Sequence, residues 1–147
     1  MSYTQIYYHI VYSTKNRLPV LKEDGRKQLY SYLWGILKNK KCYLYQIGGT
    51  DDHIHFLISL HSTVCLANLV RDIKKSSTAW IKQEKIFHQF SGWQNEYGAF
   101  TKSHSDKDMI ISYIKNQPEH HRNESFIDEF KRLLNEENVD FDEQYIR

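Results

Sequence analysis

Two histidines, His53 and His55, are separated by one residue in a stretch of apolar and β-branched side chains. Residues two apart on a β-strand point to the same face, so a strand here would place both imidazoles side by side. Ile54, Phe56 and Ile58 would then form an apolar opposite face for packing. Two imidazoles fixed on a strand supply two of the ligands that a divalent ion needs. The spacing alone favours two ordinary histidines, and the clean division of faces strengthens the interpretation as a metal site.

A second pair of functional side chains, Tyr113 and Gln117, is spaced by four residues in a segment with helical periodicity. One turn of an α-helix separates such residues, so a hydroxyl and an amide would project from the same side. Both could reach one metal-centred site. A tyrosine on a helix is more commonly a packing residue. Composition does not single out Tyr113 among the 11 tyrosines of the chain.

Basic side chains recur on one face of a predicted long helix over residues 63–85. They are Arg71, Lys74, Lys75 and Lys82, and two further cations, Lys15 and Arg17, follow the first predicted strand. Together they could follow a phosphate backbone. A solvated helix face would give the same pattern, and the sequence leaves both interpretations open.

The elements that must position these groups follow from periodicity and turn residues. We expect strands at residues 4–13, 42–47, 53–60 and 94–102. One expected helix begins at Asp24, and three more cover residues 63–85, 106–117 and 125–137. We expect Pro118 to end the third helix. The order is the ferredoxin-like split β-α-β-β-α-β with an antiparallel sheet, followed by C-terminal helices that carry the tyrosine. This α+β arrangement predicts crossover helices on one sheet face and a free opposite face for the site.

Composition restricts the class of protein. The 147 residues predict one domain spanning 1–147, and 40% hydrophobic with 26% charged residues is typical of a globular chain. A mean hydropathy of −0.67 and the lack of a long apolar run argue against a membrane span. Two cysteines, Cys42 and Cys65, provide no disulfide framework. We therefore expect a cytoplasmic protein.

The formal net charge of +2 hides an uneven distribution. Residues 1–118 hold 16 Lys and Arg against 9 Asp and Glu, a net +7, whereas residues 119–147 hold 4 against 9, a net −5. The segment with the candidate site is therefore basic enough to hold a nucleic-acid strand, and 119–147 is an acidic helical extension.

Four stretches of the chain match the motifs of one family: residues 9–17, 52–57, 93–100 and 113–121. The second contains the histidine-hydrophobic-histidine motif after an acidic turn. On these motifs the chain resembles the single-tyrosine HUH transposases of the small insertion-sequence type. The last two stretches, with the ending 141–146, are most similar to the branch that includes REP-associated tyrosine transposases. The resemblance covers nearly the whole chain.

The resemblance implies a role for each matching residue. His53 and His55 would be metal ligands, Gln117 would complete the metal site, and Tyr113 would be the nucleophile. Four further residues match the pattern without a firm role: His9, Asp52, His120 and His121. Of these, His9 and Asp52 could orient the metal ligands.

The family relationship also implies an activity. Such enzymes cleave and rejoin single-stranded DNA at hairpin-marked ends through a 5′-phosphotyrosine intermediate, using Mg²⁺ or Mn²⁺. Histidine ligands favour Mn²⁺ over Mg²⁺. No nucleotide cofactor is expected, because the covalent link stores the phosphodiester energy. A homodimer is expected, and the sequence leaves open whether each tyrosine serves its own or the partner's histidines.

Two alternatives remain open from the sequence. A ferredoxin-like sheet with exposed aromatic residues can bind single strands by stacking alone, without catalysis. A host-domesticated relative acting on repeated extragenic hairpins would share the chemistry and differ only in substrate. An assay for DNA strand cleavage distinguishes a transposase, which cuts the strand, from a non-catalytic binding module, which does not.

Overall fold

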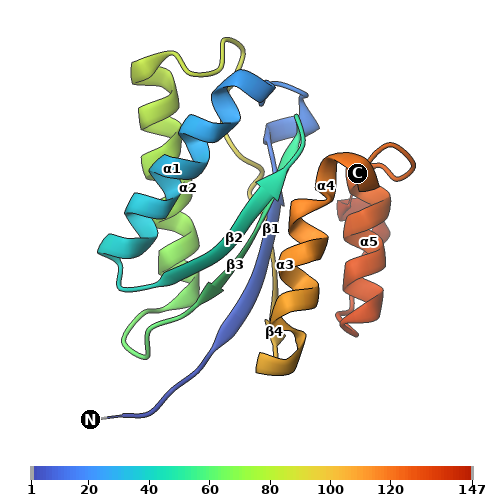
Figure 1. Ribbon diagram of the computed structural model, residues 1–147. Coiled ribbons are helices and arrows are strands. Elements are labelled where there is room, and N and C mark those ends of the chain that lie inside the picture. The colour runs from blue at the N-terminus through green and yellow to red at the C-terminus, as the bar shows by residue number, and fades with distance from the viewer. Residues whose placement is uncertain (1, 147) are drawn as a thin grey trace.

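Four antiparallel strands in the order β2-β3-β1-β4 form the central sheet of this computed structural model, which describes residues 2–146 (Figure 1). They are β1 (Tyr7–Ser13), β2 (Tyr43–Gly49), β3 (His53–Ser59) and β4 (Gly98–Lys102). The central pair, β1 and β3, is in register from Tyr7 opposite Ser59 to Ser13 opposite His53. The predicted hairpin of β2 and β3 is confirmed.

Helices cover both faces of this sheet. Figure 1 shows α1 (Glu23–Asn39) and α2 (Leu66–Glu84) on one side, and the C-terminal helices on the other. The latter are α3 (Lys107–Lys115), α4 (Gln117–His120) and α5 (Phe126–Glu136), and short 3₁₀ turns lie at Lys15–Arg17, His104–Asp106 and Glu143–Tyr145. The expected β-α-β-β-α-β order with C-terminal helices is therefore confirmed. None of the helices in residues 2–146 is both long enough and apolar enough to span a membrane.

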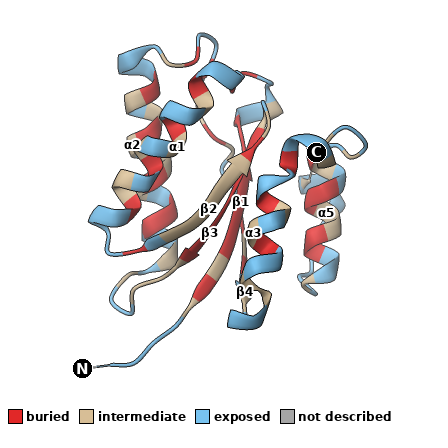
Figure 2. Cartoon of the chain, viewed as in Figure 1, coloured by how far each residue is buried: buried red, intermediate tan, exposed pale blue. Residues whose placement is uncertain are grey.

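The larger apolar core lies between the sheet and the two crossover helices. Ile54, Phe56 and Ile58 of β3 are almost fully buried there, as their alternation predicts. Leu33 of α1 and Ile73 of α2 belong to the same cluster. Figure 2 shows buried residues, in red, along the strands and on α1 and α2. Burial of each such side chain contributes about 1.5–3 kcal/mol. This packing fixes the orientation of β3, and hence the direction in which its histidines point.

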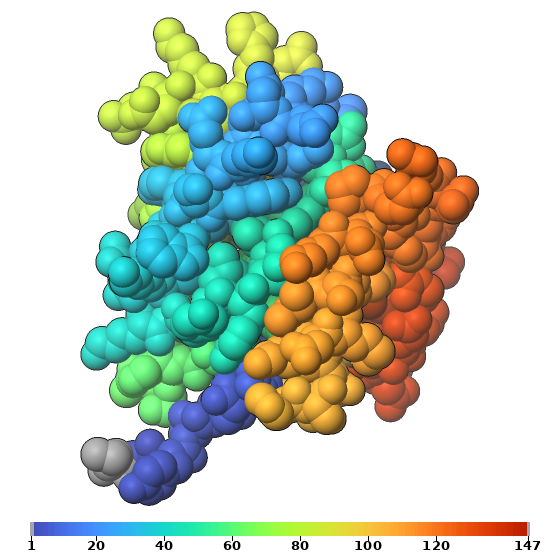
Figure 3. All heavy atoms as spheres, viewed as in Figure 1, coloured from blue at the N-terminus to red at the C-terminus, as the bar shows by residue number. Residues whose placement is uncertain are grey.

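The opposite sheet face is covered, so the expectation that it is free is wrong. Phe126 and Phe130 of α5 pack with Val11 and Phe100 of the sheet, and Ile114 of α3 packs on Leu57. In Figure 3 the C-terminal segment, orange to red, lies against the rest of the molecule. The cause is the apolar stripe of α5, which must be buried against another element.

Several element boundaries differ from expectation. β1 begins at Tyr7 and β4 at Gly98, so both strands are shorter than predicted. Helix α1 begins at Glu23 with Lys22 as its N-cap, and Asp24 lies within the first turn. The acidic Asp24 is favourable in the first turn, because this turn carries the positive end of the helix dipole.

The expected helix over 106–117 is in fact two helices. α3 ends at Lys115, and Gln117 begins the short α4. Pro118 lies in the first turn of α4 and starts that helix instead of ending the preceding one. Proline suits this position because the first N–H groups of a helix have no intrahelical acceptor. Tyr113 and Gln117 therefore belong to consecutive helices.

Candidate active site

Strand β3 positions the two predicted metal ligands beneath the C-terminal helices. His53 and His55 are both fully buried, and their ring centroids lie 5.1 Å apart. They point away from the core formed by Ile54 and Phe56, as the alternation of the strand requires. His9 of the neighbouring strand β1 is also buried on this face, with its ring stacked on that of His55.

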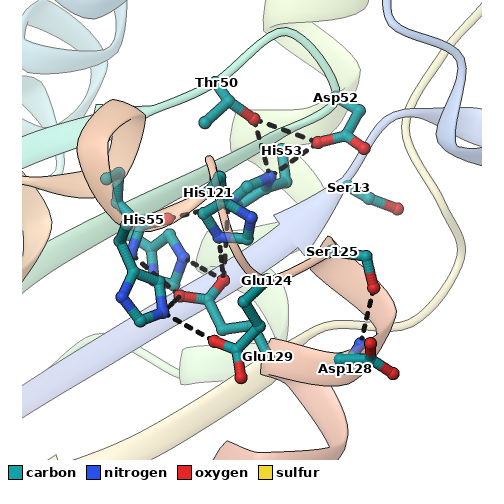
Figure 4. Close-up of polar contacts among 12 residues, drawn as sticks. Ser13, Thr50, Asp52, His53, His55, His121, Glu124, Ser125, Asp128 and Glu129 are labelled. Atoms are coloured by element: carbon teal, nitrogen blue, oxygen red, sulfur yellow. Dashed lines mark hydrogen bonds and ion pairs between the residues drawn. The ribbon is translucent and has the colours of Figure 1, made fainter.

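One carboxylate, that of Glu129 on α5, lies at the centre of the site (Figure 4). Its Oε1 is 2.9 Å from His55 Nε2, 2.9 Å from His121 Nε2 and 3.4 Å from His53 Nε2. The side chain is fully buried. A buried carboxylate is costly unless it is paired and hydrogen-bonded, and here three imidazoles provide the partners.

The second oxygen of Glu129 joins the histidines to the predicted nucleophile. Glu129 Oε2 accepts hydrogen bonds from Gln117 Nε2, at 2.9 Å, and from the Tyr113 hydroxyl. Gln117 Oε1 lies 2.9 Å from His53 Nε2. The structure therefore brings together all four residues on which the predicted chemistry depends: His53, His55, Tyr113 and Gln117.

The two β3 histidines have different partners at Nδ1. His53 Nδ1 lies 2.7 Å from Asp52 Oδ1 and 3.1 Å from Thr50 Oγ1. His55 Nδ1 lies 2.8 Å from His9 Nε2. A metal-binding histidine characteristically holds its second ring nitrogen in such a bond, which fixes the ring orientation. Asp52 and His9 thus have the geometry of orienting groups.

The two histidines have different pKa values. Burial lowers the pKa of His53, but the Asp52 and Glu129 carboxylates outweigh it and raise that pKa to about 9. Burial lowers the pKa of His55 to about 4, and the raising effect of the Glu129 carboxylate does not outweigh it. Burial alone would raise the pKa of Glu129, yet hydrogen bonds from His121, His53 and His55 hold it well below its usual range. Glu129 is therefore a carboxylate.

Tyr113 is held between a cation and an anion. Arg132 Nη2 donates to the Tyr113 hydroxyl oxygen at 2.8 Å, while that hydroxyl donates to Glu129. Burial and then the Glu129 charge raise the pKa of Tyr113, and Arg132 opposes them. Arg132 is fixed in turn by two bonds to Glu124, at 3.0 and 3.1 Å. His120 Nε2 lies 2.6 Å from Glu124 Oε1, so His120 supports this network and is not among the partners of Glu129 Oε1.

Sequence reasoning did not identify Glu129 and Arg132. One signal was present for Glu129: it lies three residues after Phe126 and four before Leu133, within the apolar stripe of α5. A charged residue at such a position is rarely fully buried unless it is paired. Arg132 shows no comparable signal, since it lies among other charged residues of an acidic segment.

Most of the predicted DNA-contacting cations line one of two hollows that share lining residues. Lys15 and Arg17 line a cavity of about 400 Å³ together with Phe126, next to the histidine cluster. Arg71, Lys74 and Lys75 line a shallow groove of about 430 Å³, and Trp93, Gln94 and Asn95 border both. Lys82 is exposed further along α2 and lines neither hollow.

Lys74 differs from the other cations of this set. Its Nζ donates to the backbone carbonyls of Gln94, Asn95 and Glu96 at 2.7, 3.3 and 2.9 Å. An ammonium group has three hydrogens, and these contacts engage all of them. Lys74 therefore fixes the segment that leads into β4, and the exposed cations of α2 are Arg71, Lys75 and Lys82.

Comparison with known proteins agrees with this fold and shows the family. The family described as "Transposase IS200 like" matches residues 2–117, so the chain belongs to the IS200-like transposases. This is a family of transposases, enzymes that cleave DNA and transfer strands. No curated protein matches the chain.

Two solved structures share the fold. A candidate transposase from Deinococcus radiodurans R1 is 21% identical, with a TM-score of 0.62 over 79% of this chain and 93% of that one. A REP-associated tyrosine transposase bound to a REP hairpin is 17% identical, with a TM-score of 0.62 over 82% of this chain and 72% of that one. The matched segment of the family contains His53, His55, Tyr113 and Gln117, whereas Glu129 lies beyond it.

Proposed function

We propose that this transposase cleaves and rejoins single-stranded DNA at hairpin-marked ends through a 5′-phosphotyrosine at Tyr113. The observation that carries the proposal is the position of the Tyr113 hydroxyl. It contacts the same carboxylate, Glu129, that His53 and His55 contact through its other oxygen. A nucleophile and a candidate metal site thus meet within one chain.

The proposed reaction balances without water or a nucleotide. The Tyr113 oxygen attacks the scissile phosphorus, the bond from phosphorus to the 3′-oxygen breaks, and that oxygen leaves as a 3′-OH after taking a proton. Tyr113 loses its proton along its hydrogen bond to Glu129, whose low pKa lets the proton pass on to the departing 3′-oxygen, so the protons balance. A 3′-OH then attacks the phosphotyrosine, which restores the tyrosine and joins the strands.

The donor set of the site fits a divalent ion. His53 and His55 offer Nε2 atoms and Gln117 offers an amide oxygen, and Asp52 and His9 hold the two rings from behind. Bound there, Mg²⁺ or Mn²⁺ would polarise the phosphate and stabilise the charge that develops on it. Imidazole ligands favour Mn²⁺ of the two.

The substrate assignment rests on chemistry and on one relative. Lys15 and Arg17 line the cavity beside the site, and exposed cations continue along α2, which suits a phosphate backbone. A structural relative, a REP-associated tyrosine transposase, is bound to a REP hairpin. We propose that hairpin-bearing single-stranded DNA is the substrate here as well.

The proposal includes a homodimer, as the family resemblance implies. In this structure Tyr113 lies beside the histidines of its own chain, which supports catalysis within one chain. A dimer would therefore serve to hold two DNA ends. Sedimentation should show a dimer on hairpin DNA, and a fully active monomer would contradict this part of the proposal.

A denaturing gel tests the proposed function. Purified protein with Mn²⁺ and hairpin-bearing single-stranded DNA should give cut strands and a DNA–protein adduct. Both products should disappear with EDTA and in the His53→Asn and His55→Asn variants, with exposed His88→Asn as the matched control. Tight binding without any scission would instead support the non-catalytic binding module.

A domesticated role on repeated extragenic hairpins is a second outcome of the same assay. The fold shared with the REP-hairpin-bound transposase favours including REP-type hairpins among the substrates. Cleavage of repeat hairpins but not of hairpins at element ends would support the domesticated role.

A further inference from the structure

We infer that Glu129 and His121 are themselves ligands of the divalent ion, so that the site is a three-histidine, one-carboxylate centre with Gln117 beside it. This inference rests on the proposed function and extends its metal site beyond the matched family segment, which ends at residue 117. Both added residues belong to the acidic extension, 119–147.

The positions of the donor atoms support the inference. One ligand atom from each of His53, His55, His121 and Glu129 can be chosen so that all four lie within 4.8 Å of one another. The three Nε2 atoms converge on Glu129 Oε1, at 2.9 to 3.4 Å. The His121 ring lies 4.4 Å from that of His53, centroid to centroid.

Charge balance gives an independent argument. Two imidazoles and an amide are neutral ligands, so an ion held by them alone would keep both charges in a buried pocket. A buried charge is costly unless an opposite charge compensates it. Glu129 is fully buried within reach of these ligands and would cancel one charge.

The Glu129 carboxylate is also preorganised for this role. Its Oε2 is fixed by Gln117 Nε2 and the Tyr113 hydroxyl, which leaves Oε1 directed at the imidazoles. The helix that carries it is anchored by Phe126 and Phe130 on the sheet. A ligand whose rotamer is fixed by its neighbours binds an ion with little loss of entropy.

Calorimetric titration of the DNA-free full-length protein with MnCl₂ tests the inference. Glu129→Gln should bind Mn²⁺ about 10-fold or more weakly than the unmodified protein, and His121→Asn should show a loss in the same direction. Asp128→Asn, an exposed acid on the same helix, is the matched control and should leave the affinity unchanged. Thermal unfolding with and without Mn²⁺ reports the same ranking, because a bound ligand raises the midpoint.

The outcomes separate this inference from the proposed function. If Glu129→Gln binds Mn²⁺ as tightly as the unmodified protein, or more tightly, Glu129 is a counter-charge that the ion displaces, and the inference is wrong. If His53→Asn alone abolishes binding in that case, the proposed two-histidine metal site still stands. No Mn²⁺ binding by the unmodified protein would overturn the metal site and the inference together. If Glu129→Gln fails to fold, His121→Asn decides, since His121 is partly exposed.

Discussion

At the scale of single residues, the site is organised by the buried carboxylate of Glu129, whose two oxygens have different hydrogen-bond partners. Oε1 of Glu129 contacts the imidazoles, and Oε2 accepts hydrogen bonds from Gln117 and Tyr113. Any change in the charge near Oε1 is therefore felt at the Tyr113 oxygen. Arg132 is the only cation among the described residues that hydrogen-bonds that oxygen, and it opposes the effect of Glu129.

Arg132 should therefore assist Tyr113 in the proposed reaction. Its guanidinium stabilises negative charge on the Tyr113 oxygen as the proton leaves, so Arg132→Gln should slow adduct formation about 10- to 100-fold. Affinity for hairpin DNA should be nearly unchanged, and Arg132→Lys should recover part of the rate. The measurement is the single-turnover rate of adduct formation on hairpin DNA.

Arg122→Gln serves as the control for this prediction. Arg122 is an exposed arginine on the loop after α4, and its carboxylate partner, Glu119, is equally exposed. An unchanged rate in Arg132→Gln, or an equal loss in both variants, would show that Arg132 does not act on Tyr113.

At the scale of elements, the site depends on how closely α3 approaches the sheet. Gly48 of β2 lies opposite His55 in the β2–β3 register. A Cβ added at Gly48 would lie 2.5 Å from the backbone oxygen of Ile114, the residue after Tyr113. Glycine at 48 therefore sets the distance between the tyrosine helix and the histidine strand.

A Gly48→Ala variant should move α3 away from the sheet. We expect a loss of about 1–3 kcal/mol in the free energy of unfolding, because the helix backbone cannot yield as a flexible side chain would. Adduct formation should fall as well, since Tyr113 moves with α3. Chemical denaturation and the adduct assay measure the two effects.

Gly35→Ala is the matched control. Gly35 lies within α1, and an added Cβ would meet nothing within 4 Å. Alanine in a helix interior is about 0.5–1 kcal/mol more favourable than glycine, so this variant should be stabilised and fully active. Equal behaviour of the two alanine variants would contradict the close approach at Gly48.

The elements also show what the sequence could and could not predict. The alternation around His53 and His55 predicted the strand, its buried side and the opposite side that holds the imidazoles. The break after Lys115 was missed, because Tyr113 and Gln117 are compatible with one continuous helix. The covering of the second face was missed because the sequence predicted α5 as a helix without indicating which surface it would pack on. Periodicity identifies an apolar stripe and does not say which surface buries it.

At the scale of the whole molecule, the uneven charge acquires a structural meaning. The basic segment 1–118 forms the sheet, the crossover helices and the cations around the two hollows. The acidic segment 119–147 contributes Glu129, which is fully buried in the site, and the partly exposed Glu124, which pairs with Arg132 beside it. Part of the negative charge of the extension is thus paired with the imidazoles and with Arg132.

The exposed cations of α2 should determine how DNA binding responds to salt. Replacing Arg71, Lys75 and Lys82 together by alanine should weaken binding of single-stranded DNA and reduce the slope of log K against log salt by about 2, near 0.7 for each lost phosphate contact. Fluorescence anisotropy across a salt series measures this. Alanine at Lys22, Lys27 and Lys38, on or beside α1, is the control, and an equal effect of both triple variants would exclude a specific path along α2.

The central claim is that Tyr113 is the nucleophile of a metal-dependent DNA transposase. Its most direct test is peptide mapping by mass spectrometry of the adduct formed with hairpin-bearing single-stranded DNA and Mn²⁺. The account predicts that the DNA is attached to the peptide containing Tyr113, and that Tyr113→Phe binds the hairpin but forms no adduct. An adduct on another residue, or one that persists in Tyr113→Phe, would contradict it.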